Sequence, residues 1–318
     1  MITAILCTGR EEPQFGWMAD SLSRCLTYYQ GPFELIVVDM LLWRDSIKLE
    51  RRSSLADAVK GRFSYRHVTP KPTPWQGPYR KTSRDYYALC NARNTGIALA
   101  RGSHVVLFDD CTVLDEQWLK WHGDAANKGL GVAGSFKSYL TATIVDGCVV
   151  SGELHPSQEH RGPIISKAYG GWMWGLNTSF PLEWALKVNG YDEKYDGQGG
   201  SEDCCLGVRL ERAGCTLVYI PECIINQILE THSPVCDFET WGKPQERKQK
   251  ERLLLDGKMH FANELLIQEL GLNPARTQPL GNEFSLRGLR DHALRTGDFP
   301  THNSLEVDWR DDERLENM

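Results

Sequence analysis

Hydrophobic and polar positions in the first forty residues predict a strand, a helix and a second strand. Ile2 to Cys7 and Phe33 to Asp39 are apolar runs with the length of buried strands. Between them, Phe15 to Tyr29 carries apolar residues at helical spacing, and Gly31-Pro32 ends that helix. This succession predicts a doubly wound sheet, on which ligands bind at the carboxyl ends of the strands.

The same kind of alternation continues to about residue 235. We predict helices at Ser46 to Val59, Asp85 to Arg101, Leu114 to Asn127, Leu182 to Val188 and Glu202 to Ala213. Further strands are predicted at Phe63 to Val68, Ser103 to Phe108 and Thr216 to Ile220. Val132 to Tyr139 and Thr143 to Val150 are predicted to form an edge hairpin that turns at Asp146-Gly147.

The last part of the chain loses this pattern. Trp241 to Leu270 is a charged amphipathic stretch with helical spacing, and the final 48 residues are polar and predicted to be irregular. We therefore predict one domain over residues 1–235 and a partly helical C-terminal extension over residues 236–318.

Composition narrows the classes of partner and the cellular location that we expect for this protein. The net charge of −6 does not favour broad phosphate binding, so a nucleic-acid partner is possible but not favoured. No apolar run reaches the length of a membrane span, and we recognise no signal peptide at the N-terminus. The ten cysteines contain no CxxC pair and are expected to be reduced thiols. These features predict a cytoplasmic protein.

Two acidic pairs are the candidate chemistry. Asp109-Asp110 follows a predicted buried strand, and Glu202-Asp203 opens a predicted helix. Adjacent carboxylates repel each other, which a nearby cation would relieve. Mg²⁺ and Mn²⁺ typically bind one or two carboxylates together with nucleotide phosphates. Two structural interpretations remain open: the first pair forms an Asp-rich turn that caps the next helix, and the second pair lies favourably at a helix N-terminus.

A glycine-rich turn lies between the two acidic pairs. Gly170-Gly171-Trp172 is predicted to bring backbone close to a ligand, where a Cβ would block the approach or oppose a left-handed φ. Trp172 and Trp174 suit either sugar stacking or core packing. Thr8, Gly9 and Asp39 follow the first two strands and belong at the same edge of the sheet.

The order of these parts resembles the inverting glycosyltransferases of the GT-A fold, especially family 2 and the galactosyltransferases related to it. The helix Asn91 to Gly102, the strand after it and Asp109-Asp110 match the family's N-terminal signature. The resemblance covers roughly residues 1–235. It implies an α/β, Rossmann-like GT-A domain, with a mixed, mostly parallel sheet flanked by helices. It also implies metal-dependent, inverting transfer of a hexosyl group from a nucleotide-diphosphate sugar, preferably UDP-linked, to a hydroxyl acceptor.

The resemblance assigns roles to individual residues. It implies that Asp203 is the general base and that Glu202 binds a hydroxyl group. Mn²⁺ or Mg²⁺ is implied at Asp110, with His232 as a further ligand. Donor-binding candidates lie on the loops and the helix at the same edge: Thr8, Gly9, Arg10, Asp39, Arg93, Asp109, Gly170, Gly171 and Trp172. The sequence departs from the family at Cys111, where the metal motif has an acid, and at Gln198 to Ser201, where a Trp-Gly is usual.

Alternatives to this assignment stay open. The acceptor is a saccharide, a lipid-linked glycan or a hydroxymethylated base of phage-type DNA. A non-catalytic protein that keeps the fold is a different class, which the four intact acids disfavour. A nucleotidyltransferase would show a glycine-rich loop with a basic residue after the first strand, and Thr8 to Glu12 is a poor version of one.

Overall fold

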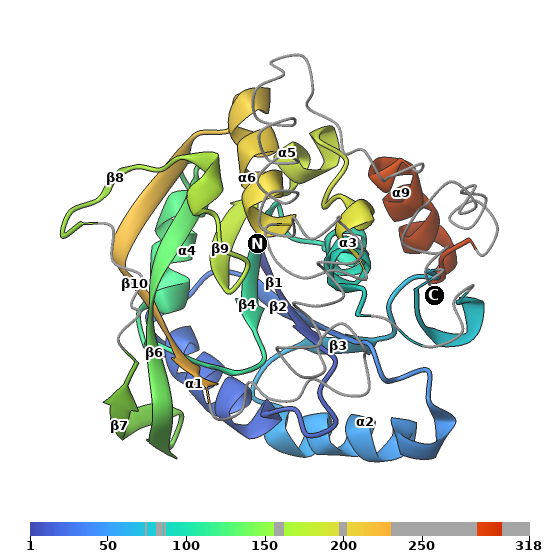
Figure 1. Ribbon diagram of the computed structural model, residues 1–318, viewed down its shortest axis with the longest axis horizontal. Helices are drawn as coiled ribbons and strands as arrows, with labels where there is room; N and C mark the ends of the chain where they lie inside the picture. The colour runs from blue at the N-terminus through green and yellow to red at the C-terminus, as the bar shows by residue number, and fades with distance from the viewer. Residues whose placement is uncertain are drawn as a thin grey trace, which may run out of the picture.

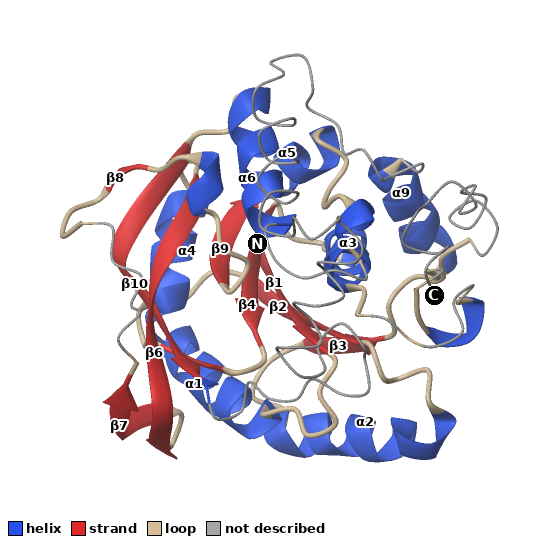
Figure 2. Cartoon of the chain, viewed as in Figure 1, coloured by secondary structure: helices blue, strands red, loops and turns tan. Residues whose placement is uncertain are grey.

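The computed structural model describes residues 1–73, 75–80, 85, 87–155, 162–196, 202–229 and 285–300. They form a ten-stranded mixed sheet with helices on both faces (Figures 1 and 2). The strands are β1 (Ile2–Thr8), β2 (Phe33–Asp39), β3 (Tyr65–Val68), β4 (His104–Asp109), β5 (Thr112–Leu114), β6 (Gly131–Val145), β7 (Cys148–Leu154), β8 (Ser166–Lys167), β9 (Asn177–Pro181) and β10 (Leu217–Ile228).

The sheet has a parallel half and a mixed half. Its order is β3-β2-β1-β4-β9-β6-β10-β5, with β7 paired to β6 and β8 paired to β10. The first four strands in this order are parallel, β9 runs antiparallel to both β4 and β6, and β6 is parallel to β10. The predicted α/β architecture is confirmed.

Helices cover both faces of the sheet because the strand residues alternate between two cores. The helices are α1 (Phe15–Tyr28), α2 (Asp45–Val59), α3 (Leu89–Leu99), α4 (Trp118–Ala126), α5 (Leu182–Lys187), α6 (Glu202–Ala213) and α9 (Leu286–Thr296), with 3₁₀ turns η1 (Gly77–Tyr79), η2 (Gly170–Trp172) and η3 (Glu193–Tyr195). Ile5 and Cys7 face the core beneath α3, α5, α6 and α9, whereas Ala4 and Leu6 face α1, α2 and α4. Both cores exclude water from the sheet.

The middle of the chain differs from the prediction in two places. The predicted hairpin with its turn at Asp146-Gly147 is present, but its first strand, β6, has 15 residues, and the first half of β6 lies inside the sheet between β9 and β10. Only its second half pairs with β7, across the predicted turn at Asp146-Gly147, where φ is +48° and +70°. β9 was missed because its residues Asn177, Thr178 and Ser179 are polar, although all three are buried.

A network of buried hydrogen bonds explains why β9 tolerates polar residues. Ser179 Oγ lies 2.8 Å from His122 Nδ1 and 3.0 Å from His104 Nε2. Asn177 Oδ1 accepts a hydrogen bond of 2.8 Å from Trp118 Nε1, and its amide nitrogen donates to two backbone carbonyls. Burial lowers the pKa of His104 and of His122 to about 3, so both rings are neutral at physiological pH.

The predicted irregular tail contains a helix. α9 begins after Ser285, whose Oγ accepts a hydrogen bond from Gly288 N, and it ends at Gly297, where φ is +82°. It packs against α3, and Leu286 belongs to the core on that face (Figure 1). The domain boundary at residue 235 stays a prediction, but α9 belongs to the packed body.

Candidate active site

Arg93 on α3 connects the two acidic pairs. Its Nη1 lies 2.7 Å from Glu202 Oε1, and its Nη2 lies 3.9 Å from Asp109 Oδ1. Burial opposes the positive charge, but Tyr191, Glu202 and Asp109 outweigh it and raise the pKa of Arg93 well above its usual value. The predicted candidates Arg93, Asp109 and Glu202 therefore lie in one place, at the carboxyl end of β4.

Glu202 and Asp203 sit differently at the start of α6. Glu202 is buried, and burial together with Asp203 raises its pKa, while Arg93 acts in the opposite direction. Asp203 is half-buried. Its Oδ2 accepts a hydrogen bond of 2.6 Å from Gly175 N, and its Oδ1 accepts one of 2.7 Å from Cys204 N. These amides fix the direction of the Asp203 carboxylate.

The Asp109-Asp110 pair also has one enclosed member. Asp110 is buried, and its two oxygens accept hydrogen bonds of 2.6 Å from Thr8 Oγ1 and 2.7 Å from Arg10 Nε. The Asp109 side chain is 34% exposed. Thr8 and Arg10 thus lie beside the first acidic pair and hold Asp110, and their donor contacts stay predictions. The metal role of Asp110 stays a prediction, and its two occupied oxygens count against it.

Asp39 lies at the carboxyl end of β2 as predicted, yet it is wholly enclosed. Arg51 donates two hydrogen bonds to it, of 2.8 and 2.9 Å, and His67 Nε2 lies 2.9 Å away. Burial opposes its charge, but these contacts lower its pKa. Arg51 also donates to the Glu11 carbonyl at 2.9 Å. Asp39 therefore fixes the loop after β1, and its side chain presents no surface to a donor.

The glycines of the Gly170-Gly171-Trp172 turn were expected to allow a left-handed φ or a close approach to a ligand, but the structure shows a different constraint. Neither Gly170 nor Gly171 has a left-handed φ. A Cβ on Gly170 would collide with the backbone of Gly207 and Val208 on α6, whereas one on Gly171 would meet nothing within 4 Å. Gly170 therefore permits close packing of η2 on α6. Gly171 O lies 3.3 Å from Cys204 Sγ, which keeps this turn beside Asp203.

The two tryptophans near this turn pack against other rings. Trp172 lies edge-on to Tyr169 and Tyr219, with ring centroids 5.3 and 6.1 Å apart. The Trp174 ring centroid is 5.3 Å from that of Phe136. Both tryptophans are half-buried. Core packing therefore accounts for part of each ring, and the donor contact of Trp172 stays a prediction.

Sequence reasoning missed several residues at this centre. Burial and the charges of Asp110 and Asp109 raise the pKa of Tyr87, which places Tyr87 beside the first acidic pair. Burial raises the pKa of Cys7 to about 12 at the end of β1. Gly175 lies so close to Arg93 that a Cβ would overlap the guanidinium. The available signal was position, because Cys7 ends a predicted strand and Tyr87 precedes Arg93 by six residues.

Cys111 stands where the metal motif has an acid. Burial raises the pKa of its thiol, which disfavours the thiolate form that binds metals. His232 lies outside the described residues. Among the residues that the structure describes, no group of three His, Cys, Asp or Glu side chains is arranged to hold a metal ion.

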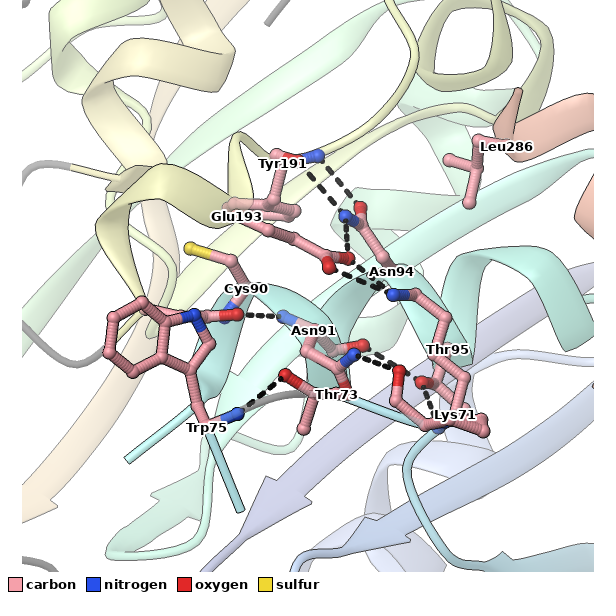
Figure 3. A network of polar contacts seen from close by, with 12 residues as sticks. Lys71, Thr73, Trp75, Cys90, Asn91, Asn94, Thr95, Tyr191, Glu193 and Leu286 are labelled. Carbon is pink, nitrogen blue, oxygen red and sulfur yellow. Dashed lines mark hydrogen bonds and ion pairs between the residues drawn. The ribbon is translucent and has the colours of Figure 1, made fainter. Parts of the chain in front are cut away.

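A buried polar network surrounds α3 (Figure 3). Lys71 Nζ lies 2.8 Å from the Glu193 carboxylate, which also accepts a hydrogen bond of 2.8 Å from Asn94 Nδ2. Asp196 accepts hydrogen bonds of 2.8 and 3.1 Å from the Cys90 and Asn91 amides. Asp196 therefore caps the N-terminus of α3 from a distant part of the chain, just before the segment that leads to Glu202.

Solved structures share this arrangement of strands and helices. S. aureus TarS 1-349 is 12% identical, with 86% of this chain and 71% of that chain covered at a TM-score of 0.50. Its complex with UDP-GlcNAc covers 90% of this chain and 75% of that one, also at 0.50. The chain has a GT-A fold.

A Pyrobaculum calidifontis mannosyltransferase in complex with GDP-Man and Mn²⁺ is 15% identical, with 94% of this chain and 76% of that one covered. The TM-score of this match is 0.46. No protein-family model matches the sequence, and no curated protein matches it by sequence. None of the helices among the described residues has the length and the apolar character that a membrane span requires.

Proposed function

We propose that this chain is a metal-dependent, inverting glycosyltransferase. It moves a hexosyl group from a nucleotide-diphosphate sugar to a hydroxyl acceptor. The observation that carries the proposal is the bridge of Arg93 between Asp109 and Glu202, which unites two acidic pairs from distant parts of the sequence. The TarS structures with UDP and with UDP-GlcNAc support the GT-A fold and make a UDP-linked donor the first choice.

Asp203 is the proposed general base. Its carboxylate is half-buried and is aimed by the backbone amides of Gly175 and Cys204. Asp203 takes the proton from the acceptor hydroxyl as that oxygen attacks the anomeric carbon. The bond from that carbon to the nucleoside diphosphate breaks on the opposite side, so the configuration inverts. Glu202, held by Arg93, binds a hydroxyl of the acceptor or the donor.

The donor is proposed to lie over the carboxyl ends of β1 and β4. Thr8 and Gly9 lie where β1 ends, and Arg10 and Arg93 are already paired with Asp110 and Glu202, so a bound cation would have to supply the positive charge that a diphosphate needs. The nucleotide would meet Asp109, the more exposed acid of its pair, before it met Asp110.

The residues present fit a hard divalent cation such as Mn²⁺ or Mg²⁺. Asp109 offers a partly exposed carboxylate, and the two phosphates of the donor supply further oxygen ligands. A bound ion would neutralise charge on the departing diphosphate. We place Asp109 first among the ligands, with Asp110 behind it, and the predicted ligand His232 lies outside the described residues.

A donor screen tests the proposal. UDP, GDP, CDP and TDP sugars are added to the full chain with and without Mn²⁺, and the melting temperature and the release of free nucleotide are measured. We expect a metal-dependent stabilisation by one nucleotide, because a ligand of the folded state raises its stability by mass action. That nucleotide should also be released on turnover. Stabilisation without release in the presence of mixed sugar acceptors would instead favour a non-catalytic binding protein.

A further inference from the structure

The Arg93 guanidinium rests on an aromatic ring. Its central carbon lies 5.0 Å from the ring centroid of Tyr191. Tyr191 is fully buried and Arg93 is nearly so. A cation over an aromatic face is attracted by the ring quadrupole, and this attraction is largest where water is excluded. Asp109 and Glu202 pull the same guanidinium toward two different elements, while Tyr191 supports it from the turn before η3.

Tyr191 is itself fixed by the neighbour of Arg93 on α3. The Asn94 amide accepts a hydrogen bond of 2.7 Å from Tyr191 N and donates one of 2.9 Å to Tyr191 O. The turn before it is shaped for this contact, because Gly190 has a φ of +72° and a Cβ there would overlap the Asn94 side chain. One helix thus holds both the guanidinium and the ring beneath it.

The Asn94 amide is fixed in turn by a buried ion pair (Figure 3). Its Nδ2 donates to Glu193 at 2.8 Å, and the Lys71 ammonium group lies 2.8 Å from the same carboxylate. The Lys71 side chain is almost entirely enclosed. A charge buried in this way persists only with its partner, so the pair defines one position for Asn94. Contacts therefore run without a break from Lys71 to Arg93.

We propose that Tyr191 is a positioning residue that keeps the Arg93 guanidinium between Asp109 and Glu202, and that Asn94 with the Lys71–Glu193 pair keeps Tyr191 in place. This inference rests on the proposed function. Without the ring, the guanidinium is free to follow one acid and leave the other. Besides Arg93, the titratable groups that face Glu202 from the described residues are Cys90 on α3, Tyr191 in the turn and Asp203 beside it on α6.

The test compares Tyr191→Phe with Tyr191→Leu. Phenylalanine keeps the aromatic face, whereas leucine removes it. Phe180→Leu is the matched control, because Phe180 is a fully buried ring in the same core. We expect Tyr191→Leu to lower kcat about tenfold, the equivalent of a desolvated cation–π contact, and Tyr191→Phe to stay within about threefold. The acid limb of the kcat profile should move to higher pH in Tyr191→Leu only, because Glu202 loses a fixed cation.

Equal kcat values and equal acid limbs in Tyr191→Leu and Phe180→Leu would overturn the inference. If Tyr191→Leu does not fold, Asn94→Ala carries the same test, since it releases the Tyr191 backbone and leaves the ring in the chain. A parent protein that turns over no donor would instead defeat the proposed function. The positioning role is then read from ¹⁵N relaxation of the Arg93 Nε–H group, which should be rigid in the parent and mobile in Tyr191→Leu. Equal rigidity in both proteins would sink it.

Discussion

The two acidic pairs, Asp109-Asp110 and Glu202-Asp203, are held in place by different partners. In the first pair, Asp110 is held by Thr8 and Arg10 while Asp109 is 34% exposed. In the second, Glu202 is held by Arg93 while Asp203 is half-buried and is aimed by two backbone amides. Each pair thus has one buried acid that lies 2.7 Å from a buried arginine and one acid that is more exposed. Adjacent carboxylates in a sequence therefore need not share a role.

The largest effect should separate the two members of the second pair. Asp203→Asn keeps the shape and removes the base, so we expect kcat to fall about 1,000-fold with donor affinity unchanged. Glu202→Gln should instead weaken both binding and turnover, because Arg93 loses a charged partner. Asp124→Asn on α4, in a partly exposed pair with Lys120, is the control for the substitution itself. Normal turnover by Asp203→Asn would remove it as the base.

The next prediction separates the members of the first pair. If Asp109 is the acid that meets the metal, Asp109→Asn should abolish the Mn²⁺ dependence of donor binding while the melting temperature without ligands changes little. Asp110→Asn should lower that melting temperature, because Thr8 and Arg10 lose a buried acceptor. Calorimetric titration of the donor with and without Mn²⁺ measures the first effect. The reverse pattern would restore Asp110 as the principal ligand.

Low pH should destabilise the protein through His104 and His122, which are buried in the mixed half of the sheet. Burial holds the pKa of His104 and His122 near 3, while an unfolded histidine titrates near 6.5. The unfolded chain therefore binds more protons between these values. The contribution of the two neutral rings to the free energy of unfolding should be present above pH 6.5. Below that pH, the free energy of unfolding should fall by about 1.4 kcal/mol per pH unit for each histidine.

Urea unfolding of the parent and of His122→Gln at pH 7.5, 6.5 and 5.5 measures this slope. The variant should be less stable at pH 7.5 but should show the smaller loss between pH 6.5 and 5.5. A parent whose stability does not change over this interval would show that the two rings are not held neutral by burial.

The smallest effect is expected for the packing of η2 against α6, the helix that begins with Glu202 and Asp203. Gly170→Ala places a methyl group against the backbone of Gly207 and Val208, which cannot rotate away, so we expect a loss of about 1–3 kcal/mol of stability. Gly171→Ala has open space and should leave the free energy of unfolding unchanged. Chemical denaturation of both variants decides the matter, and equal stabilities would mean that η2 does not press on α6.

The sequence predicts best those elements whose buried side chains are mostly apolar. β1, β2 and β4 each contain a run of four hydrophobic residues, so their positions and the acids after them are visible in the pattern. β9 is equally buried, but its Asn177 and Ser179 are satisfied by His104, His122 and Trp118 from other elements. Local patterning cannot show such partners.

The same reasoning applies to the site. The sequence places Asp109-Asp110 and Glu202-Asp203 at one edge of the sheet, because each follows from the position of a strand or a helix. It does not show which acid of each pair is exposed, since that depends on Arg10 and Arg93. Asp39 shows this limit of the sequence most clearly. It lies at the predicted end of its strand, yet Arg51 and His67 enclose its side chain.

The contact between α3 and α9 has a consequence for synthesis. Arg290 donates hydrogen bonds to the carbonyls of Ala98 and Ala100 at the end of α3, and Leu286 N donates one of 2.6 Å to Asn189 Oδ1. As the chain emerges from the ribosome, α3 is made some 190 residues before the helix that closes its C-terminal end. Contacts so distant in sequence slow folding. In a nascent chain, the last carbonyls of the helix that carries Arg93 therefore gain this partner only after residue 290 has been made, and a chain released before that point lacks it.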